Sequence, residues 1–261
     1  MHLQSIRLTN YRNYKQTEVA FEQDINLLLG ENAQGKTNML EAIYVLAMAK
    51  AHRMPKDKEL IRWNQEYAKI EGRAERKNGC ISLEIVISEQ GKKAKLNSLE
   101  QQKLSDYVGA LNVVMFAPED LALVKGSPSV RRRFIDMEIA QIQPVYLHDL
   151  GQYQKLLQQR NKLLKDLQRQ SGQERMTMLD IWTESLIELA AKIVDQRFRF
   201  LMKLQNCAYP IHNEISSGIE RLKLNYLPTV DVSDNDDLSN IIEAYAKKFA
   251  KIKEREIERG T

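Results

Sequence analysis

One segment near the amino terminus, residues 30–37, combines the residue types that bind phosphate. It reads Gly-Glu-Asn-Ala-Gln-Gly-Lys-Thr and fits the spacing G-x-x-x-x-G-K-[ST] of a phosphate-binding loop. The two glycines allow close backbone approaches that a Cβ would block, so the loop amides can surround an anion. The lysine would reach the β- and γ-phosphates, and the threonine hydroxyl would ligate Mg²⁺. The predicted nucleotide-binding residues are Gly30, Glu31, Asn32, Ala33, Gln34, Gly35, Lys36 and Thr37, with Thr37 also the Mg²⁺ ligand.

The segments on both sides of this loop fit the context that the motif requires. The apolar run of residues 25–29 has the length of a buried β-strand. After the loop, apolar residues recur at helical spacing, at Met39, Leu40, Ile43, Leu46 and Ala47, which predicts a helix. The alternative interpretation is a glycine-bearing turn with an unrelated lysine, and the flanking strand and helix argue against it.

Further strands are predicted on both sides of the phosphate loop. Residues 3–8 and 19–21 read as two short strands, and residues 67–73, 81–88 and 93–96 read as a meander joined by turns at Asn78-Gly79 and Gln90-Gly91. A parallel phosphate-loop strand beside antiparallel strands predicts a mixed sheet in an α/β fold. Residues 111–116 predict another buried strand, but Pro118 separates it from Glu119, so we do not assign these acids to a Walker B motif.

From Val145 onward the pattern is helical. Two amphipathic stretches on either side of a break at residues 170–173 predict a long antiparallel helix hairpin. We expect its second helix to run about 40 Å and to end at Pro210, followed by a strand at residues 219–227 and a charged helix at residues 241–257. The predicted domains are an N-terminal ATPase lobe, 1–115, and a mainly helical arm lobe, 116–261.

Composition excludes several classes of protein. The 261 residues carry a net charge of +4, which permits a polyanionic partner without requiring one. The two cysteines, Cys80 and Cys207, lie far apart in apolar surroundings, so we expect both to be buried and unpaired, as in a reducing cytoplasm. No signal peptide and no apolar run long enough to cross a bilayer is visible, which predicts a soluble, cytoplasmic protein with no membrane partner.

Three basic segments are candidates for contact with nucleic acid. They are residues 50–58, 92–95 and 131–133. Each also has a simpler explanation, because charge runs often mark a solvated face and lysines protect an edge strand. Three consecutive arginines cannot all face one side of a helix, so at least one of Arg131, Arg132 and Arg133 is expected to be structural. The sequence leaves the choice among the three segments open.

Four segments read together resemble the bacterial RecF family. They are residues 10–14 (NYRNY), 30–38 (GENAQGKTN), 116–121 (FAPEDL) and 125–134 (KGSPSVRRRF). Their spacing covers the whole chain, and the combination is far more specific than a phosphate loop alone. The family is similar to SMC and ABC-type ATPases, in which an N-terminal lobe carries the phosphate loop, a helical lobe follows, and two molecules sandwich ATP.

The resemblance implies a DNA-repair protein that binds ATP and single-stranded or gapped DNA. It implies dimerisation on ATP and action with RecO and RecR to help load RecA, in replication-fork repair and the SOS response. Carried over by position, Lys36 and Thr37 would hold the phosphates and Mg²⁺, and Arg12 would contact the nucleotide phosphates. No residue is assigned a catalytic role.

Two motifs that the family needs for hydrolysis are not found. Residues 104–107 (LSDY) match an ABC-type signature only superficially, because they lack the glycine that lets a partner's backbone approach the γ-phosphate. No strand ends in Walker B acids. We therefore expect a C-terminally truncated fragment in which the return to the ATPase lobe is missing and ATP hydrolysis is negligible.

Two other functions are alternatives to this one. A small-molecule P-loop kinase would need its catalytic acid and lid arginines within this chain, and Arg131–Arg133 would have to supply the latter. A purely structural fragment would bind neither nucleotide nor DNA. A DNA titration separates these functions, because binding through DNA phosphates weakens steeply with salt, whereas a kinase should show little affinity for DNA.

Overall fold

The computed structural model describes residues 1–52, 57–77, 79–169 and 172–260. The chain forms two compact units. The first comprises Met1–Phe134 and Ala140–Pro144, and the second comprises Ile135–Ile139 and Val145–Thr261. The division falls within helix α3 (Pro128–Ile142). The division into separate domains at residues 1–115 and 116–261 stays a prediction.

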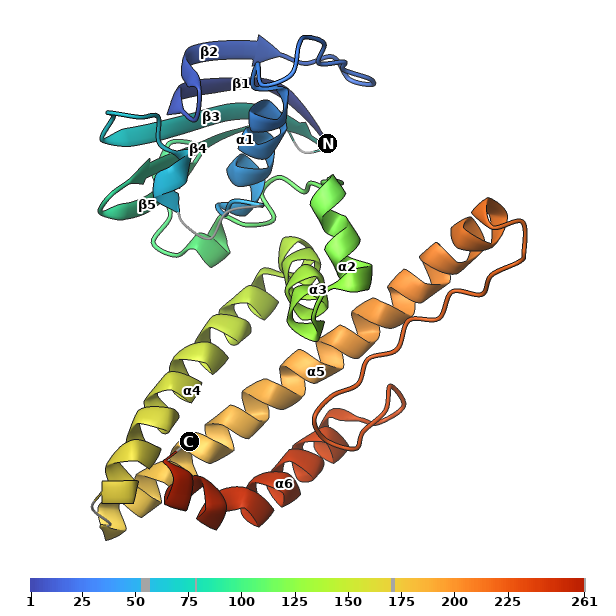
Figure 1. Ribbon diagram of the computed structural model, residues 1–261. Helices are drawn as coiled ribbons and strands as arrows, with labels where there is room; N and C mark the ends of the chain where they lie inside the picture. Colours follow the sequence, from blue (N-terminus) through green and yellow to red (C-terminus); the bar gives the residue numbers. More distant parts are fainter. Residues whose placement is uncertain (53–56, 78, 170–171, 261) are drawn as a thin grey trace. The chain divides into compact units, whose positions relative to one another are not determined.

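The first unit is built on a six-stranded sheet. Its strands are β1 (His2–Tyr11), β2 (Tyr14–Ala20), β3 (Tyr67–Arg76), β4 (Gly79–Ser88), β5 (Gly91–Leu96) and β6 (Leu99–Glu100). They lie in the order β2-β1-β3-β4-β5-β6 (Figure 1), and each neighbouring pair is antiparallel. The strands predicted at residues 3–8, 67–73, 81–88 and 93–96 are confirmed with longer bounds, and the one predicted at 19–21 is the end of β2, which stops at Ala20. In the predicted turn Asn78-Gly79, Asn78 lies outside the described residues.

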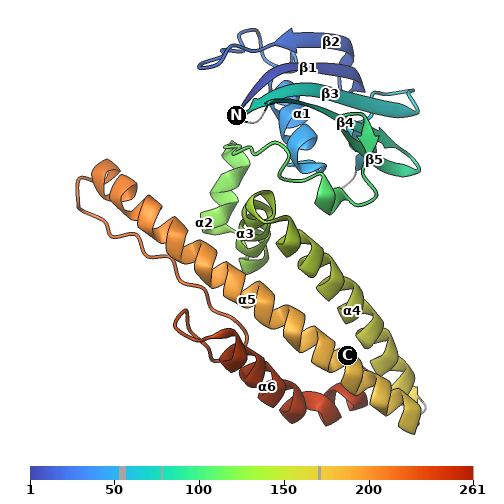
Figure 2. The ribbon, with the colours of Figure 1, turned by 180° about the vertical axis from the view of Figure 1, so that it is seen from behind.

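Helix α1 (Lys36–Met48) covers one face of this sheet, as the two opposite views show (Figures 1 and 2). Burial alternates along β4, in which Leu83, Ile85 and Ile87 are buried. Helix and sheet approach closely at Gly72, where any added Cβ would overlap the side chain of Leu46. The helix that follows the phosphate loop is thereby fixed to the centre of the sheet.

The prediction of a mixed sheet is wrong for the described residues. Residues 25–29 and 111–116, both predicted as buried strands, form no ladder, and Leu29 and Val114 are 87% and 88% exposed. A strand is stable only where neighbouring backbone groups satisfy its amides and carbonyls. The apolar pattern of these segments does not supply such a neighbour, and none of the described strands lies beside them.

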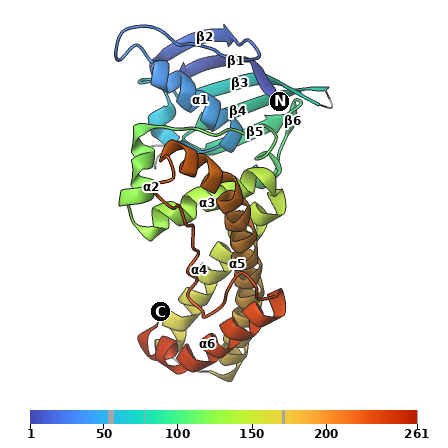
Figure 3. The same ribbon diagram turned by 90° about the vertical axis from the view of Figure 1, so that its right-hand side faces the viewer.

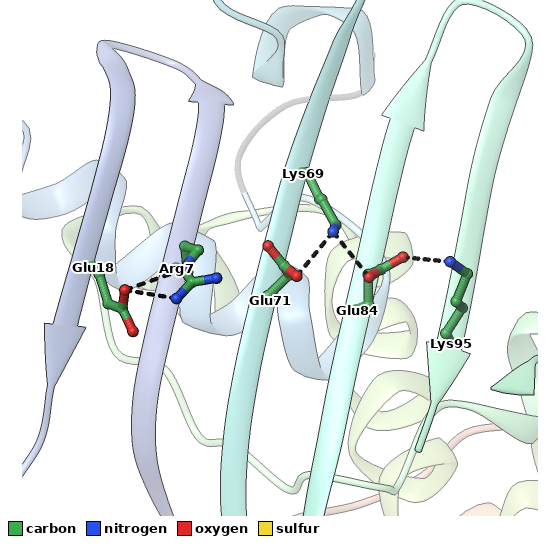
Figure 4. Close-up of polar contacts among 6 residues, drawn as sticks. All are labelled: Arg7, Glu18, Lys69, Glu71, Glu84 and Lys95. Atoms are coloured by element: carbon green, nitrogen blue, oxygen red, sulfur yellow. Dashed lines mark hydrogen bonds and ion pairs between the residues drawn. The ribbon is translucent and has the colours of Figure 1, made fainter. Parts of the chain in front are cut away.

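The opposite face of the sheet carries a ladder of charged side chains (Figure 4). Neighbouring strands contribute alternating cations and carboxylates, and such cross-strand pairs stabilise a sheet modestly. The ion pairs are Arg7–Glu18, Lys69–Glu71, Lys69–Glu84 and Lys95–Glu84, at N···O distances of 2.8, 2.8, 3.1 and 2.9 Å. Arg7, Lys69 and Lys95 are therefore already neutralised within the unit.

Short helical segments complete the first unit. They are the 3-10 helices η1 (Asp57–Leu60), η2 (Leu104–Asp106) and η3 (Pro118–Leu121), the one-turn helix α2 (Ala122–Lys125) and most of α3. Helix α3 begins at Pro128, a residue type that suits the first position of a helix because it needs no N–H partner there. Tyr107, which follows η2, is buried and donates its hydroxyl to Leu46 O at 2.6 Å. The residues that superficially match a signature motif thus lead into the core of this unit.

The second unit is helical. Helices α4 (Pro144–Arg169) and α5 (Gln173–Ile215) form the predicted antiparallel hairpin, and α6 (Leu238–Arg259) packs along α5 (Figures 1 and 3). The hairpin turn at residues 170–171 lies outside the described residues. Near that end, Leu163, Leu164, Leu167 and Leu179 form an apolar cluster against which Trp182 also packs. In the part of the chain described here, no helix is long and apolar enough to cross a membrane.

Three predictions for the second unit are wrong. Helix α5 continues through Pro210 to Ile215, because a proline removes one N–H donor and crowds the preceding turn without preventing helix beyond it. At 43 residues the helix is about 65 Å long, not about 40 Å. Residues 219–227, which were predicted as a strand, form no strand. As for residues 25–29, none of the described strands lies beside them to satisfy their backbone groups. The predicted charged helix is confirmed as α6.

Both cysteines are exposed rather than buried, so that prediction is also wrong. Cys80 is the second residue of β4, and Cys207 lies near the carboxyl end of α5. Apolar neighbours in sequence do not decide which face of an element a residue occupies. Both thiols are free, as expected.

Candidate functional site

The phosphate loop follows the geometry that its glycines predicted. Gly30 and Gly35 have φ angles of 148° and 107°, and α1 begins at the next residue, Lys36. Glu31, Asn32, Ala33 and Gln34 form the exposed part of the loop. Among the hydrogen bonds between described residues, none has a backbone amide of residues 31–35 as its donor. These amides remain available to an anion at the start of a helix.

The side chain of Lys36 closes the loop. Its Nζ donates to the carbonyl oxygens of Gly30 and Glu31, each at 2.6 Å. The ammonium therefore lies beside the loop amides, where a phosphate would meet both. Thr37 is exposed in the first turn of α1, and its hydroxyl has no partner among the described residues. The predicted phosphate and Mg²⁺ ligands lie together at one point of the loop.

The turn between β1 and β2 holds the loop from one side. Asn13 Nδ2 donates to Gln34 O at 3.1 Å, and Tyr14 OH donates to Gly35 O at 3.1 Å. A Cβ on Gly35 would lie 2.6 Å from Asn13 Nδ2, so only glycine fits there. Asn13 and Tyr14 belong to a segment that resembles the RecF family, but the sequence did not predict this role for them. Their separation from the loop by about twenty residues leaves no local signal.

Arg12 is held by protein groups. Its Nε and Nη2 donate to Glu41 Oε2 at 3.1 and 2.9 Å, and its Nη1 donates to Glu59 O at 3.0 Å. The same carboxylate oxygen accepts from Tyr11 OH at 3.4 Å, and burial, followed by the nearby Glu41 charge, raises the pKa of Tyr11. Arg12 also has a left-handed φ of 51°, which costs energy in a non-glycine residue. Sequence reasoning found Arg12 but missed Glu41, one helical turn after Thr37.

The basic segment at residues 92–95 is neutralised internally. Lys92 Nζ donates to Ala49 O at 2.6 Å and pairs with Asp57 at 2.8 Å. Lys93 and Lys95 pair with Glu100 and Glu84, at 3.5 and 2.9 Å. These lysines serve the sheet and its connections, so the segment is the weakest of the three candidates for DNA contact.

The other two basic segments meet near Lys50. Arg131 is structural, as at least one of the three arginines was predicted to be, because its Nη1 donates to Gly126 O and Leu123 O at 2.9 and 3.3 Å. Burial lowers the pKa of Lys50, and the charges of Arg133 and Lys92 lower it further. Arg133 therefore acts on Lys50 as a nearby like charge, while the Asp57 carboxylate opposes the lowering of this pKa. Residues 53–56 of the first segment lie outside the described residues.

The acidic residues after residue 116 are engaged locally. Asp120 Oδ2 accepts from the backbone amide of Ala117 at 2.7 Å, and Asp120 Oδ1 lies 3.2 Å from His52 Nε2. This carboxylate caps the 3-10 helix η3, which agrees with leaving it out of a Walker B motif. Among the described residues, no cluster of three or more His, Cys, Asp or Glu side chains could hold a metal ion.

Comparison with known proteins gives a consistent result. Residues 1–257 match the family model described as an AAA ATPase domain. The chain is 64% identical over 260 residues to the DNA replication and repair protein RecF of Geobacillus sp. (strain WCH70), and 59% identical to that of Bacillus subtilis (strain 168). It covers 69% and 70% of those proteins, and each match covers 100% of this chain.

Solved structures agree. The structure of the recombination mediator protein RecF-ATP in the RecFOR pathway superposes with a TM-score of 0.93 at 32% sequence identity, covering 99% of this chain and 69% of the other. The corresponding RecF-ATPrS structure gives a TM-score of 0.90 at the same identity, over 100% of this chain and 70% of the other.

Proposed function

Because this chain belongs to the RecF family of DNA replication and repair proteins, we propose that it binds ATP with Mg²⁺ at residues 30–37 and acts in recombinational DNA repair. The observation that carries the proposal is the loop itself. Its amides at residues 31–35 are free among the described residues, and Lys36 and Thr37 lie at its helical end. These groups suit a triphosphate bound to a divalent cation.

Each part of the site has a role in this proposal. The loop amides and the Lys36 ammonium neutralise the β- and γ-phosphates, and the Thr37 hydroxyl ligates Mg²⁺. Arg12 contributes positive potential beside the phosphates, and the N–H groups that Glu41 and Glu59 leave unused are available to them. Asn13 and Tyr14 keep the loop in shape by binding its carbonyls.

Substitution of Lys36 tests nucleotide binding. Lys36→Ala removes the charge that faces the phosphates, so we expect affinity for Mg²⁺-ATP, measured by isothermal titration calorimetry, to fall at least tenfold. Lys15→Ala is the matched control, because Lys15 is an exposed lysine on β2 without a bonded partner among the described side chains. Equal affinity of the two variants for ATP would overturn the proposed site.

DNA is the proposed macromolecular partner. Phosphate contacts from lysine and arginine supply most sequence-independent affinity for DNA, and Lys50 and Arg133 supply positive charge in one region of the first unit. Arg132 is exposed next to them and has no bonded partner among the described residues. We propose that these three residues contact the backbone of single-stranded or gapped DNA, without reading base sequence.

The remaining partners follow from the family and the pathway named for its solved member. In this proposal the protein dimerises when ATP is bound, acts with RecO and RecR in the cytoplasm, and helps load RecA at gaps during replication-fork repair and SOS induction. The proposal favours a repair protein over a small-molecule kinase, because matches to RecF proteins extend over the whole chain.

A further inference from the structure

An open groove in the second unit lies beside the last third of α5. The chain that follows this helix runs back along it, as the two opposite views show (Figures 1 and 2). The groove has a volume of about 720 Å³ and is lined by Gln205, Asn206 and Tyr209 of α5 and by residues 221–223 of the returning chain. We call it the α5 groove. All of its lining residues belong to one compact unit.

One side chain of α5 fixes the returning chain. Gln205 Nε2 donates to Leu222 O at 3.0 Å, and Leu224 N donates to Gln205 Oε1 at 2.6 Å. Leu222 and Leu224 are half-buried, whereas the alternate residues Arg221 and Lys223 are exposed. Alternate side chains of an extended chain point to opposite sides. The two cations are therefore displayed to solvent from a backbone that is held in place.

These two cations have no partner within the protein. Neither Arg221 nor Lys223 forms an ion pair or a hydrogen bond with any other described residue. The acid that precedes them, Glu220, lies 3.5 Å from His212 on α5. Residues two apart in an extended chain are separated by about 6.6 Å. The pair can therefore contact successive negative groups along one extended polyanion.

The helix contributes an aromatic ring and an amide to the same groove. Asn206 and Tyr209 lie on one face of α5, because they are three residues apart. Tyr209 is 38% exposed, and neither side chain has a partner among the described residues. Surfaces that bind single-stranded nucleic acid combine such a ring, on which a base stacks, with cations that contact the backbone. An acidic peptide would use the cations but not the ring.

Resting on the proposed binding of DNA, we propose that the α5 groove is a binding site for single-stranded DNA. In this site one unpaired base stacks on Tyr209, and the neighbouring phosphates contact Arg221 and Lys223. The Asn206 amide can donate to or accept from the same nucleotide. Because every base has a π-face, the site accepts any sequence. The second unit thereby adds a contact of its own to the basic surface proposed for the first unit.

Two ligands separate base stacking from phosphate contact. Oligothymidine and an abasic strand of equal length are titrated by fluorescence anisotropy in the presence of Mg²⁺-ATP. Arg221→Ala combined with Lys223→Ala should weaken both ligands and lower the slope of log affinity against log salt by about 1.4, because each single-strand phosphate contact contributes about 0.7. Tyr209→Ala should weaken oligothymidine about tenfold and leave the abasic strand unchanged, whereas Tyr209→Phe should retain the affinity for oligothymidine.

The matched control removes the same charge elsewhere in the second unit. Lys155 and Lys162 are exposed lysines of α4 without partners among the described residues, and their joint substitution by alanine should change neither affinity nor salt dependence. Because Tyr209, Arg221 and Lys223 are exposed and form no bonds, the melting temperature of every variant should match that of the parent.

Each contrary result has a distinct meaning. Unchanged affinity of Tyr209→Ala for oligothymidine, or an equal loss in the α4 control, would overturn the α5 groove as a DNA site. Tighter binding of polyglutamate than of oligothymidine, abolished by the substitution of Arg221 and Lys223, would assign the groove to an acidic protein and overturn it as well. If the unsubstituted protein binds neither strand, the DNA-binding part of the proposed function fails too. If Arg132→Ala weakens oligothymidine and the groove variants do not, only the groove fails.

Discussion

Glu41 shows how one buried carboxylate organises the site. Its side chain is 3% exposed, and one of its oxygens accepts from Arg12 twice and from Tyr11 once. Removing one partner of a buried ion pair leaves the other charge unpaired, which typically costs about 3–5 kcal/mol. We therefore expect Glu41→Ala to lower the free energy of unfolding by about 3 kcal/mol, measured by urea denaturation.

Glu31→Ala is the matched control for that measurement, because the Glu31 side chain is exposed and unbonded among the described residues, and its loss should change stability by less than about 0.5 kcal/mol. A result in which the two variants are equally stable would contradict the role given to Glu41.

The residue types of the phosphate loop were predictable from the sequence because their spacing is local. The roles of Glu41 and Asn13 were not, because only the folded chain brings Arg12 to Glu41 and Asn13 to the loop.

At the scale of elements, the periodicity of apolar residues predicted those helices and strands that local sequence alone determines. The strands β1 to β5 and the helices α1, α4 and α6 follow from alternation or helical spacing. The strands expected at residues 25–29, 111–116 and 219–227 did not follow, because a strand also needs a neighbour to satisfy its backbone. Helix α5 passed Pro210 because a single proline weakens a helix locally and leaves the residues beyond it free to continue.

A glycine within α4 gives a prediction at this scale. Gly151 lies eight residues into the helix, and an added Cβ would meet no atom within 4 Å. Alanine avoids the backbone entropy that glycine loses in a helix, so Gly151→Ala should stabilise the second unit by about 0.5–1 kcal/mol. The measurement is thermal or urea unfolding followed by circular dichroism.

Gly35→Ala serves as the opposite case, since its backbone has a φ of 107° and a Cβ would collide with Asn13. Destabilisation by Gly151→Ala comparable with that of Gly35→Ala would show that α4 is not a regular helix at this point.

At the scale of the whole molecule, charge decides where a polyanion can bind. The net charge of +4 said little by itself, and the sequence left three basic segments open. The fold distinguishes them, because Lys92, Lys93 and Lys95 are paired with carboxylates, whereas Arg132 is free among the described residues and Lys50 lies near Arg133. Only tertiary structure reports which charges already have partners.

DNA titration tests this distinction. Arg132→Ala and Arg133→Ala should each weaken binding to a gapped duplex, measured by fluorescence anisotropy, and should each reduce the dependence of log affinity on log salt by about one phosphate contact. Lys93→Ala is the control, because Lys93 pairs with Glu100, and it should change neither quantity. Equal effects of all three substitutions would contradict a localised contact surface.

The Lys36 ammonium already makes two short hydrogen bonds within the loop. A nucleotide that binds there exchanges its phosphate oxygens for these two partners. An incoming ligand must compensate for the Gly30 and Glu31 carbonyls that already solvate this cation. Chloride or a lone carboxylate, with one negative charge, offers little advantage over two carbonyl dipoles, whereas a polyphosphate brings several charges to the same place. The resting loop therefore discriminates against the small monovalent anions that surround it, before any other part of the nucleotide is recognised.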